Sequence, residues 1–82
     1  MIEKEVLAIL DEILVLRGRS KDFDRDTPLL GALPELDSMA VIGLIGLIEE
    51  RFGLVLEDDE IDGSIFVSVG SLTDFVAGKL GR

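Results

Sequence analysis

Apolar residues recur at steps of three and four along the start of the chain, the spacing that places side chains on one face of a helix. The residues that share this face are Ile2, Val6, Ile9, Ile13 and Leu16. Gly18 follows the last of them, and glycine favours the end of a helix. The pattern therefore predicts a first helix that begins near the N-terminus and stops at Gly18.

Residues 18–37 break this periodicity and predict a long loop. The residues in it that disfavour a continuing helix are Gly18, Ser20, Asp22, Asp24, Asp26, Pro28, Gly31 and Pro34. A structureless loop of this length is unusual in a compact domain and more often belongs to a functional surface. It could equally be a connector that Leu29, Leu30, Leu33 and Leu36 fix to the core.

A second helix is predicted to begin at Asp37, whose carboxylate can cap the first turn, and to run to Arg51 or Phe52 before Gly53 stops it. Its predicted buried stripe is Val41, Ile45, Ile48 and Phe52, flanked by Ile42 and Leu44. The predicted outward side is Met39, Gly43, Gly46, Leu47 and Glu50. This outward side is unusually apolar.

Two further elements follow an acidic turn at residues 57–62. A short third helix is suggested by Ile61, Ile65 and Phe66. Ser68 can cap a last helix, whose inward residues are Val69, Leu72, Val76 and Leu80. Residues 1–82 therefore predict a single all-α domain, a small four-helix bundle with a long first loop and a short third helix.

Composition limits the classes of function open to this bundle. The chain of 82 residues has 17 acidic and 8 basic side chains, a formal net charge of −9, and neither Cys nor His. This charge repels nucleic acid and anionic lipid, so the expected partners are proteins with basic patches. The missing Cys and His exclude a disulfide framework, a Cys zinc site and the commonest general base. Any thiol chemistry must come from outside the chain.

The chain also lacks the patterns of export and membrane insertion. Its first residues, Met-Ile-Glu-Lys-Glu-Val, have neither the basic flank nor the cleavage site of a signal peptide. The longest apolar run, residues 39–48, is ten residues long, whereas a bilayer span needs about 20. We therefore expect a cytoplasmic protein with no stable membrane insertion. We also expect it to be a monomer.

The acidic turn contains one candidate metal motif. Asp58, Glu60, Asp62 and Gly63 match the opening of a calcium-binding loop. The twelfth position of such a loop needs a bidentate Glu, and here it is Val69. We therefore interpret this stretch as a solvated acidic turn with no metal.

The start of the second helix holds the other candidate for chemistry, the dipeptide Asp37-Ser38. A serine at this position could be a nucleophile, a modification site or part of a cap. Without His or Cys, only a Lys or a carboxylate could serve as its base, and no motif fixes one beside Ser38. Intrinsic catalysis is thus disfavoured, while modification and capping both stay open.

Four short stretches of the chain form an ordered set. They are Asp26-Thr27-Pro28-Leu29, Leu36-Asp37-Ser38-Met39, the run Glu49-Glu50-Arg51-Phe52-Gly53 with Leu54-Val55-Leu56, and Ser68-Val69-Gly70-Ser71-Leu72. In this order and at this spacing the set resembles the acyl carrier protein family, and the resemblance covers nearly the whole chain.

The resemblance implies a role for the serine. Ser38, with Asp37 as its flanking motif residue, would be modified from coenzyme A by a phosphopantetheinyl transferase. The 4′-phosphopantetheine arm would hold acyl groups as thioesters and present them to acyl-loading and acyl-processing enzymes, as in fatty acid or polyketide biosynthesis. Bond making and breaking would belong to those partners, so the resemblance implies a carrier and not an enzyme.

The second helix departs from the pattern of this family, whose fatty-acid carriers tend to place acidic residues soon after the serine. Here acidity returns only at Glu49 and Glu50. The expected partner-binding residues are Met39, Ala40, Gly43, Gly46, Leu47, Glu49 and Glu50. This departure favours a carrier for a dedicated biosynthetic pathway, loaded by its own adenylating ligase. An aminoacyl or peptidyl carrier is one alternative, and a helical interaction module with an unmodified Ser38 is another.

Overall fold

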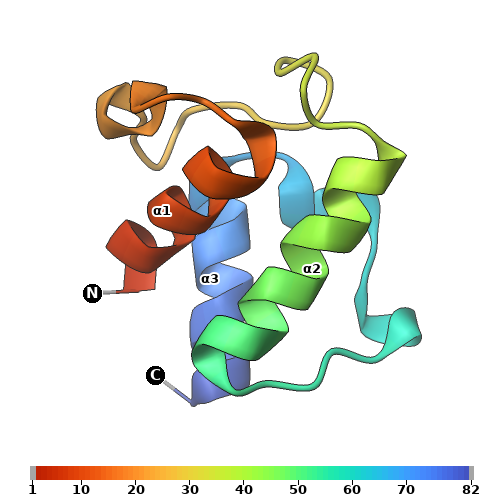
Figure 1. Cartoon of the computed structure of the whole chain (residues 1–82). Helices are drawn as coiled ribbons and strands as arrows, with labels where there is room; N and C mark the ends of the chain where they lie inside the picture. Colours follow the sequence, from red (N-terminus) through yellow and green to blue (C-terminus); the bar gives the residue numbers. More distant parts are fainter. Residues whose placement is uncertain (1, 82) are drawn as a thin grey trace.

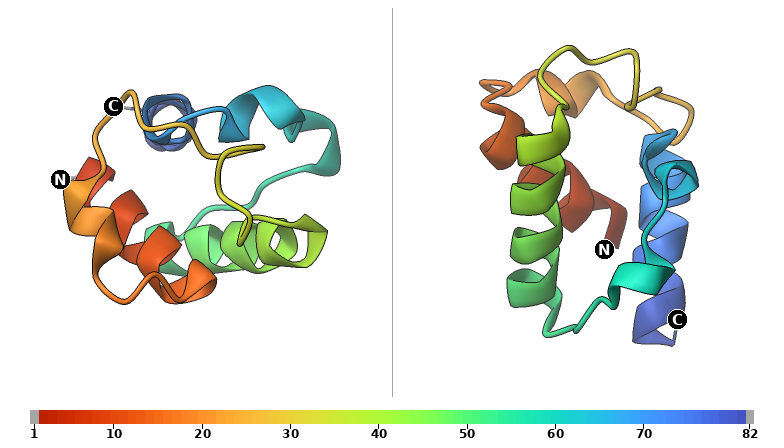
Figure 2. Two further views of the ribbon diagram at one scale, coloured as in Figure 1. Left: turned by 90° about the horizontal axis from the view of Figure 1, so that it is seen from above. Right: turned by 90° about the vertical axis from the view of Figure 1, so that its right-hand side faces the viewer.

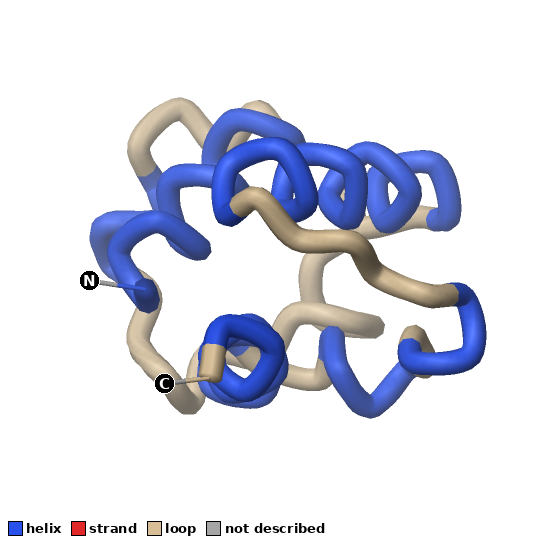
Figure 3. The backbone as a smooth tube through the Cα atoms, turned by 90° about the horizontal axis from the view of Figure 1, so that it is seen from below, coloured by secondary structure: helices blue, strands red, loops and turns tan. Residues whose placement is uncertain are grey.

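The computed structural model describes residues 2–81, and for Asp58 only the backbone. It has three α-helices, α1 (Ile2–Leu14), α2 (Ser38–Phe52) and α3 (Val69–Leu80), and three short 3₁₀ turns, η1 (Arg19–Asp22), η2 (Asp58–Glu60) and η3 (Gly63–Phe66). Helix α1 packs against both α2 and α3 (Figure 1). The described part of the chain contains no β-strand (Figure 3), and none of its helices is long and apolar enough to cross a membrane.

The predicted short third helix is a single 3₁₀ turn, so the bundle has three α-helices where four were predicted. Turn η3 spans four residues that begin with Gly63 and Ser64, and neither residue type is a good helix former. Ser68 then takes an extended conformation as the cap of α3, which prevents the turn from continuing. The side chains of Ile65 and Phe66 are nevertheless buried, as their apolar character predicted.

The first helix ends four residues earlier than predicted, at Leu14 instead of Gly18. Val15 follows it in the left-handed conformation, at φ 53°, which is costly for a β-branched residue and is usually left to glycine. The Leu16 amide donates to the carbonyl oxygen of Asp11 at 3.0 Å, and the Leu16 side chain is buried. These two contacts close the helix without the glycine on which the sequence prediction relied.

Helix α2 has the predicted ends, with Asp37 as its N-terminal cap and Gly53, at φ 65°, after its last residue. Its buried side differs from the prediction by about one residue, because Leu44 and Ile48 are fully buried whereas Ile45 and Phe52 are half-buried. Apolar residues occur on almost every side of this helix, so periodicity alone could not fix the inward face.

Three of the residues on α2 that were predicted to bind partners lie on its α1 side instead. Ala40, Gly43 and Leu47 share one face of the helix by their spacing, and all three are half-buried. A Cβ added at Gly43 would lie 3.5 Å from Cδ1 of Ile13, a side chain of α1. The small residue at position 43 therefore belongs to the packing of two helices and not to an open surface.

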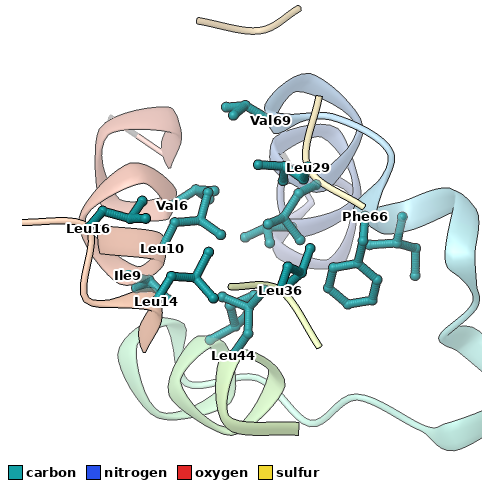
Figure 4. Close-up of a cluster of buried hydrophobic side chains, with 14 of the residues drawn as sticks. Val6, Ile9, Leu10, Leu14, Leu16, Leu29, Leu36, Leu44, Phe66 and Val69 are labelled. Atoms are coloured by element: carbon teal, nitrogen blue, oxygen red, sulfur yellow. The ribbon is translucent and has the colours of Figure 1, made fainter. Parts of the chain in front are cut away.

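The core draws on the long segment between α1 and α2 as well as on the helices. Leu29 and Leu36 of this segment lie among buried side chains of α1, α2 and α3 (Figure 4). Leu33 is half-buried and Leu30 is 48% exposed, so two of the four leucines provide the fixed points. The interpretation of this loop as a pinned connector is confirmed for Leu29 and Leu36.

Backbone hydrogen bonds join the same segment to the start of α3. Leu29 and Leu30 donate to the carbonyl oxygens of residues 67 and 66, both at 2.9 Å. In return, the first amides of α3, those of Val69 and Gly70, donate to the carbonyl oxygens of residues 27 and 25 at 3.0 and 2.9 Å. The segment thus runs from the end of α1 past the start of α3 and on to the start of α2 (Figure 2).

This pairing requires a residue without a side chain at position 70. A Cβ on Gly70 would lie 2.9 Å from the carbonyl oxygen of Arg25, a backbone atom that is itself held in the pairing. We therefore expect Gly70→Ala to lower the free energy of unfolding by about 1–3 kcal/mol, the usual range for an overpacked site. Chemical denaturation followed by circular dichroism measures this change.

Gly78 provides the matched control, because it lies in the same helix and a Cβ there would meet no atom within 4 Å. Gly78→Ala should leave stability unchanged or raise it by less than about 1 kcal/mol. Equal effects of the two substitutions would contradict the close approach of residue 25 to α3.

Candidate functional site

Ser38 is the first residue of α2, and it is exposed. The carboxylate of Asp37 accepts a hydrogen bond from the Ala40 amide at 2.8 Å, and the Asp37 carbonyl oxygen accepts one from Val41 at 2.9 Å. The amides of Ser38 and Met39 belong to the first turn and have no intrahelical acceptor. The Ser38 hydroxyl is therefore presented to solvent at the positive end of a capped helix.

A short turn carries the chain from the core to Ser38. Leu36 is buried, and its amide donates to the Leu33 carbonyl oxygen at 3.0 Å. The Asp37 amide donates to the carbonyl oxygen of Glu35 at 3.1 Å. The Glu35 carboxylate pairs with the guanidinium of Arg19, and this hydrogen bond lowers the pKa of Glu35 below its ordinary value.

Arg19 in turn lies in a segment that α1 holds in place. The Asp11 carboxylate of α1 accepts hydrogen bonds from the Ser20 hydroxyl at 2.7 Å, from the Gly18 amide at 3.0 Å and from the Ser20 amide at 3.3 Å. The bond from the Ser20 hydroxyl, followed by that from Gly18, lowers the pKa of Asp11. A continuous set of polar contacts thus runs from α1 to the turn before Ser38.

A groove lies beside α2, beginning one helical turn after Ser38. Its volume is about 350 Å³, and it is lined by Ile42, Ile45, Gly46, Glu49, Leu56 and Ile61. The Glu49 carboxylate accepts a hydrogen bond from the Leu56 amide at 2.8 Å, which ties α2 to the segment after it. Glu49, predicted to bind partners, is thus half-buried and already holds the backbone on the far side of the groove.

The residues predicted to bind partners are not all on one surface. Met39 is 76% exposed, Glu50 is exposed, and a Cβ on Gly46 would meet no atom within 4 Å. Sequence reasoning missed Ile42, which is 65% exposed, because its spacing placed it on the flank of the buried stripe. The exposed apolar surface of α2 is therefore Met39, Ile42 and Gly46, without Ala40, Gly43 and Leu47.

The acidic turn has contacts within the protein. Glu60 pairs with Lys79 of α3, and Asp62 caps η3 by accepting a hydrogen bond from the Ser64 amide at 2.9 Å. Among the described residues, no group of three or more acidic side chains is placed to hold a metal ion. Two of the four residues of the calcium-like motif thus serve the fold.

Ser38 has none of the neighbours that activate a catalytic serine. The chain contains no His and no Cys, and among the described side chains no hydrogen bond joins the Ser38 hydroxyl to an acidic or a basic group. A nucleophilic serine needs such a base within hydrogen-bond reach. The described side chains therefore offer no such base to Ser38.

Comparisons with known proteins agree with this geometry. No family model matches the sequence, and no match is found among curated proteins. A solved structure does match, the solution NMR structure of a holo acyl carrier protein from Nitrosomonas europaea. It is 42% identical in sequence, with a TM-score of 0.90, and the match covers 99% of this chain and 96% of that chain. At this identity and coverage, the chain belongs to the acyl carrier protein family.

Proposed function

We propose that this chain carries acyl groups as thioesters on a 4′-phosphopantetheine arm joined to Ser38. The arm would come from coenzyme A through a phosphopantetheinyl transferase. The observation that carries the proposal is the exposed Ser38 hydroxyl, which directly follows the cap of α2 in a chain of this family. The holo form of the similar protein from Nitrosomonas europaea supports a prosthetic group, and a group of this kind would supply the thiol that the sequence lacks.

The residues around Ser38 fit a phosphodiester. The first-turn amides of Ser38 and Met39 are free to face an anion, and an exposed anion at a helix N-terminus is favoured by about 0.3–1 kcal/mol. The Asp37 carboxylate carries a negative charge, but it is turned to the Ala40 amide as the cap. Helix α2 therefore keeps its cap whether or not Ser38 is modified.

The chain's own residues would present the cargo and leave the chemistry to partner enzymes. Asp37 fixes the first turn of α2, and Leu36 fixes the chain just before it, so the attachment point has a defined position on the surface. A fixed base lets an attached flexible arm deliver its end to one enzyme after another.

Modification at Ser38 gives the direct test of the proposal. Protein made with a compatible transferase and coenzyme A should gain the mass of one phosphopantetheine group, and Ser38→Ala should abolish the gain. The variant should keep its helical circular dichroism, because a lost exposed hydroxyl changes stability by less than about 0.5 kcal/mol. Intact mass spectrometry with peptide mapping measures both.

Ser64→Ala is the control, since Ser64 is also exposed but lies in η3, away from the start of α2. It should be modified as fully as the wild type. Modification of a different serine, or none in the wild type, would overturn the proposal.

The exposed face of α2 further suggests how partners recognise the carrier. Met39 and Ile42 offer apolar side chains within about one helical turn of Ser38, and Gly46 lets a partner approach the backbone closely. Because acidic side chains are absent from this part of the face, we propose that acyl-loading and acyl-processing enzymes dock mainly by hydrophobic contact. Such docking suits a dedicated pathway better than the general fatty-acid cycle.

Charge placed on this face should then weaken docking strongly. We expect Met39→Asp and Ile42→Asp to lower affinity for the cognate loading enzyme at least tenfold, because an unpaired charge would enter a desolvated contact. Titration of the enzyme with each variant measures the change.

Two controls separate apolar docking from its alternatives. Val55→Asp places the same charge on a residue that is 72% exposed and lies outside α2, so binding should be unaffected. Glu50→Lys reverses an exposed charge on α2 and should have only a small effect. If Glu50→Lys were crippling while the Asp variants of α2 bound normally, docking would rest on charge.

A further inference from the structure

We infer that the ion pair between Arg19 and Glu35 positions Ser38 for its modification. The pair would act by holding residues 33–37, the turn before Ser38, in the arrangement that the transferase accepts. This inference rests on the proposed function, in which a transferase modifies Ser38. Arg19 and Glu35 are assigned a positioning role, in which they act on Ser38 through the turn.

The turn has few other restraints. The backbone amides of residues 32–37 that donate hydrogen bonds reach only nearby acceptors. Ala32 and Leu33 donate to the carbonyl oxygen of residue 29, Leu36 to that of residue 33, and Asp37 to that of residue 35. The buried side chain of Leu36 anchors the turn to the core, and the Arg19–Glu35 pair adds a second anchor beside it. Apart from the two hydrogen bonds by which Asp37 caps α2, the polar contact that ties this turn to another part of the fold, among the described residues, is the Arg19–Glu35 pair.

Contacts other than the one with Glu35 also hold Arg19 in place. Its Nε donates to the Leu16 carbonyl oxygen at 3.2 Å, and Leu16 is buried. The residues on both sides of it, Gly18 and Ser20, donate to the Asp11 carboxylate of α1. An exposed ion pair usually contributes little because two mobile side chains must be ordered. That cost is reduced here, since Arg19 is already fixed.

Glu35 depends on this one partner. One of its carboxylate oxygens accepts from Arg19, and the other, Oε1, is buried without a hydrogen-bond partner among the described residues. Without Arg19, the whole carboxylate would lie half-buried and unpaired, which favours a turn that moves it into solvent. The backbone carbonyl oxygen of Glu35 accepts a hydrogen bond from the amide of Asp37, the cap of α2. A movement of Glu35 would therefore also displace this cap.

The expected effect on the kinetics of the transferase follows from the fraction of carrier molecules in which the turn has the accepted arrangement. If only a fraction of molecules present Ser38 in the accepted arrangement, apparent affinity falls by that fraction, while the chemistry of the bound complex is unchanged. Glu35→Ala and Arg19→Ala should each raise the KM of the transferase for this carrier about three- to tenfold and leave kcat within about a factor of two. The KM for the double variant should equal that for each single variant, because either substitution alone already removes the ion pair.

A second ion pair of the same segment supplies the control. Arg25 makes two hydrogen bonds to Asp74 of α3, at 3.1 and 2.8 Å, and this pair is also largely exposed. Asp74→Ala removes an ion pair of the segment between α1 and α2 but leaves the Arg19–Glu35 pair intact. The KM of the transferase for this variant should therefore equal that for the wild type. A KM raised equally by Asp74→Ala, or an unchanged KM for Glu35→Ala, would overturn the inference.

Amide hydrogen exchange on the unmodified protein gives a readout that needs no transferase. The amides of Asp37 and Ala40 should exchange faster in Glu35→Ala than in the wild type, and at the wild-type rate in Asp74→Ala. Unchanged exchange in Glu35→Ala would overturn the inference even if Ser38 is modified normally. A wild-type protein that no transferase modifies would instead refute the proposed function, while the exchange rates would still decide whether the pair holds the turn.

Discussion

The pairing of residues 25–30 with residues 66–70 is the constraint on which the rest of this small fold depends. A segment that places Leu29 and Leu36 in the core must also find partners for its backbone groups, because a buried unpaired amide is costly. The start of α3 has the matching need, since the first amides of a helix lack intrahelical acceptors. The pairing meets both needs, and Gly70 is the residue that permits the close approach.

The position of Ser38 follows from this arrangement. The segment enters the core at Leu29, crosses the ends of the helices and returns to the core at Leu36, two residues before the serine (Figures 1 and 2). Asp37, the residue between Leu36 and Ser38, caps α2. A carrier needs a rigid base beneath a mobile arm, and we propose that a buried leucine, a helix cap and an ion pair together provide that base.

Features set by neighbouring residues, and the burial of apolar residues such as Leu29 and Ile65, could be predicted from the sequence. Specific contacts between distant parts of the chain could not. The caps at Asp37 and Ser68 and the glycine after α2 depend on local chemistry, and all were predicted. Val15 ends α1 in a left-handed conformation, which the burial of Leu16 and its hydrogen bond to Asp11 explain. The motif around Ser38 indicated the candidate site. Its support by Arg19 and Glu35 could not be predicted, because these residues lie 16 positions apart.

Native-state hydrogen exchange of the paired backbone tests this account most directly. The amides of Leu29, Leu30, Val69 and Gly70 donate across the pairing, so they should be protected to the same degree as the amides in the middle of α1. Such protection would show that the long segment is a fixed part of the fold and opens only when the whole domain opens. Exchange of these four amides at the rate of exposed loops, with α1 still protected, would contradict the account.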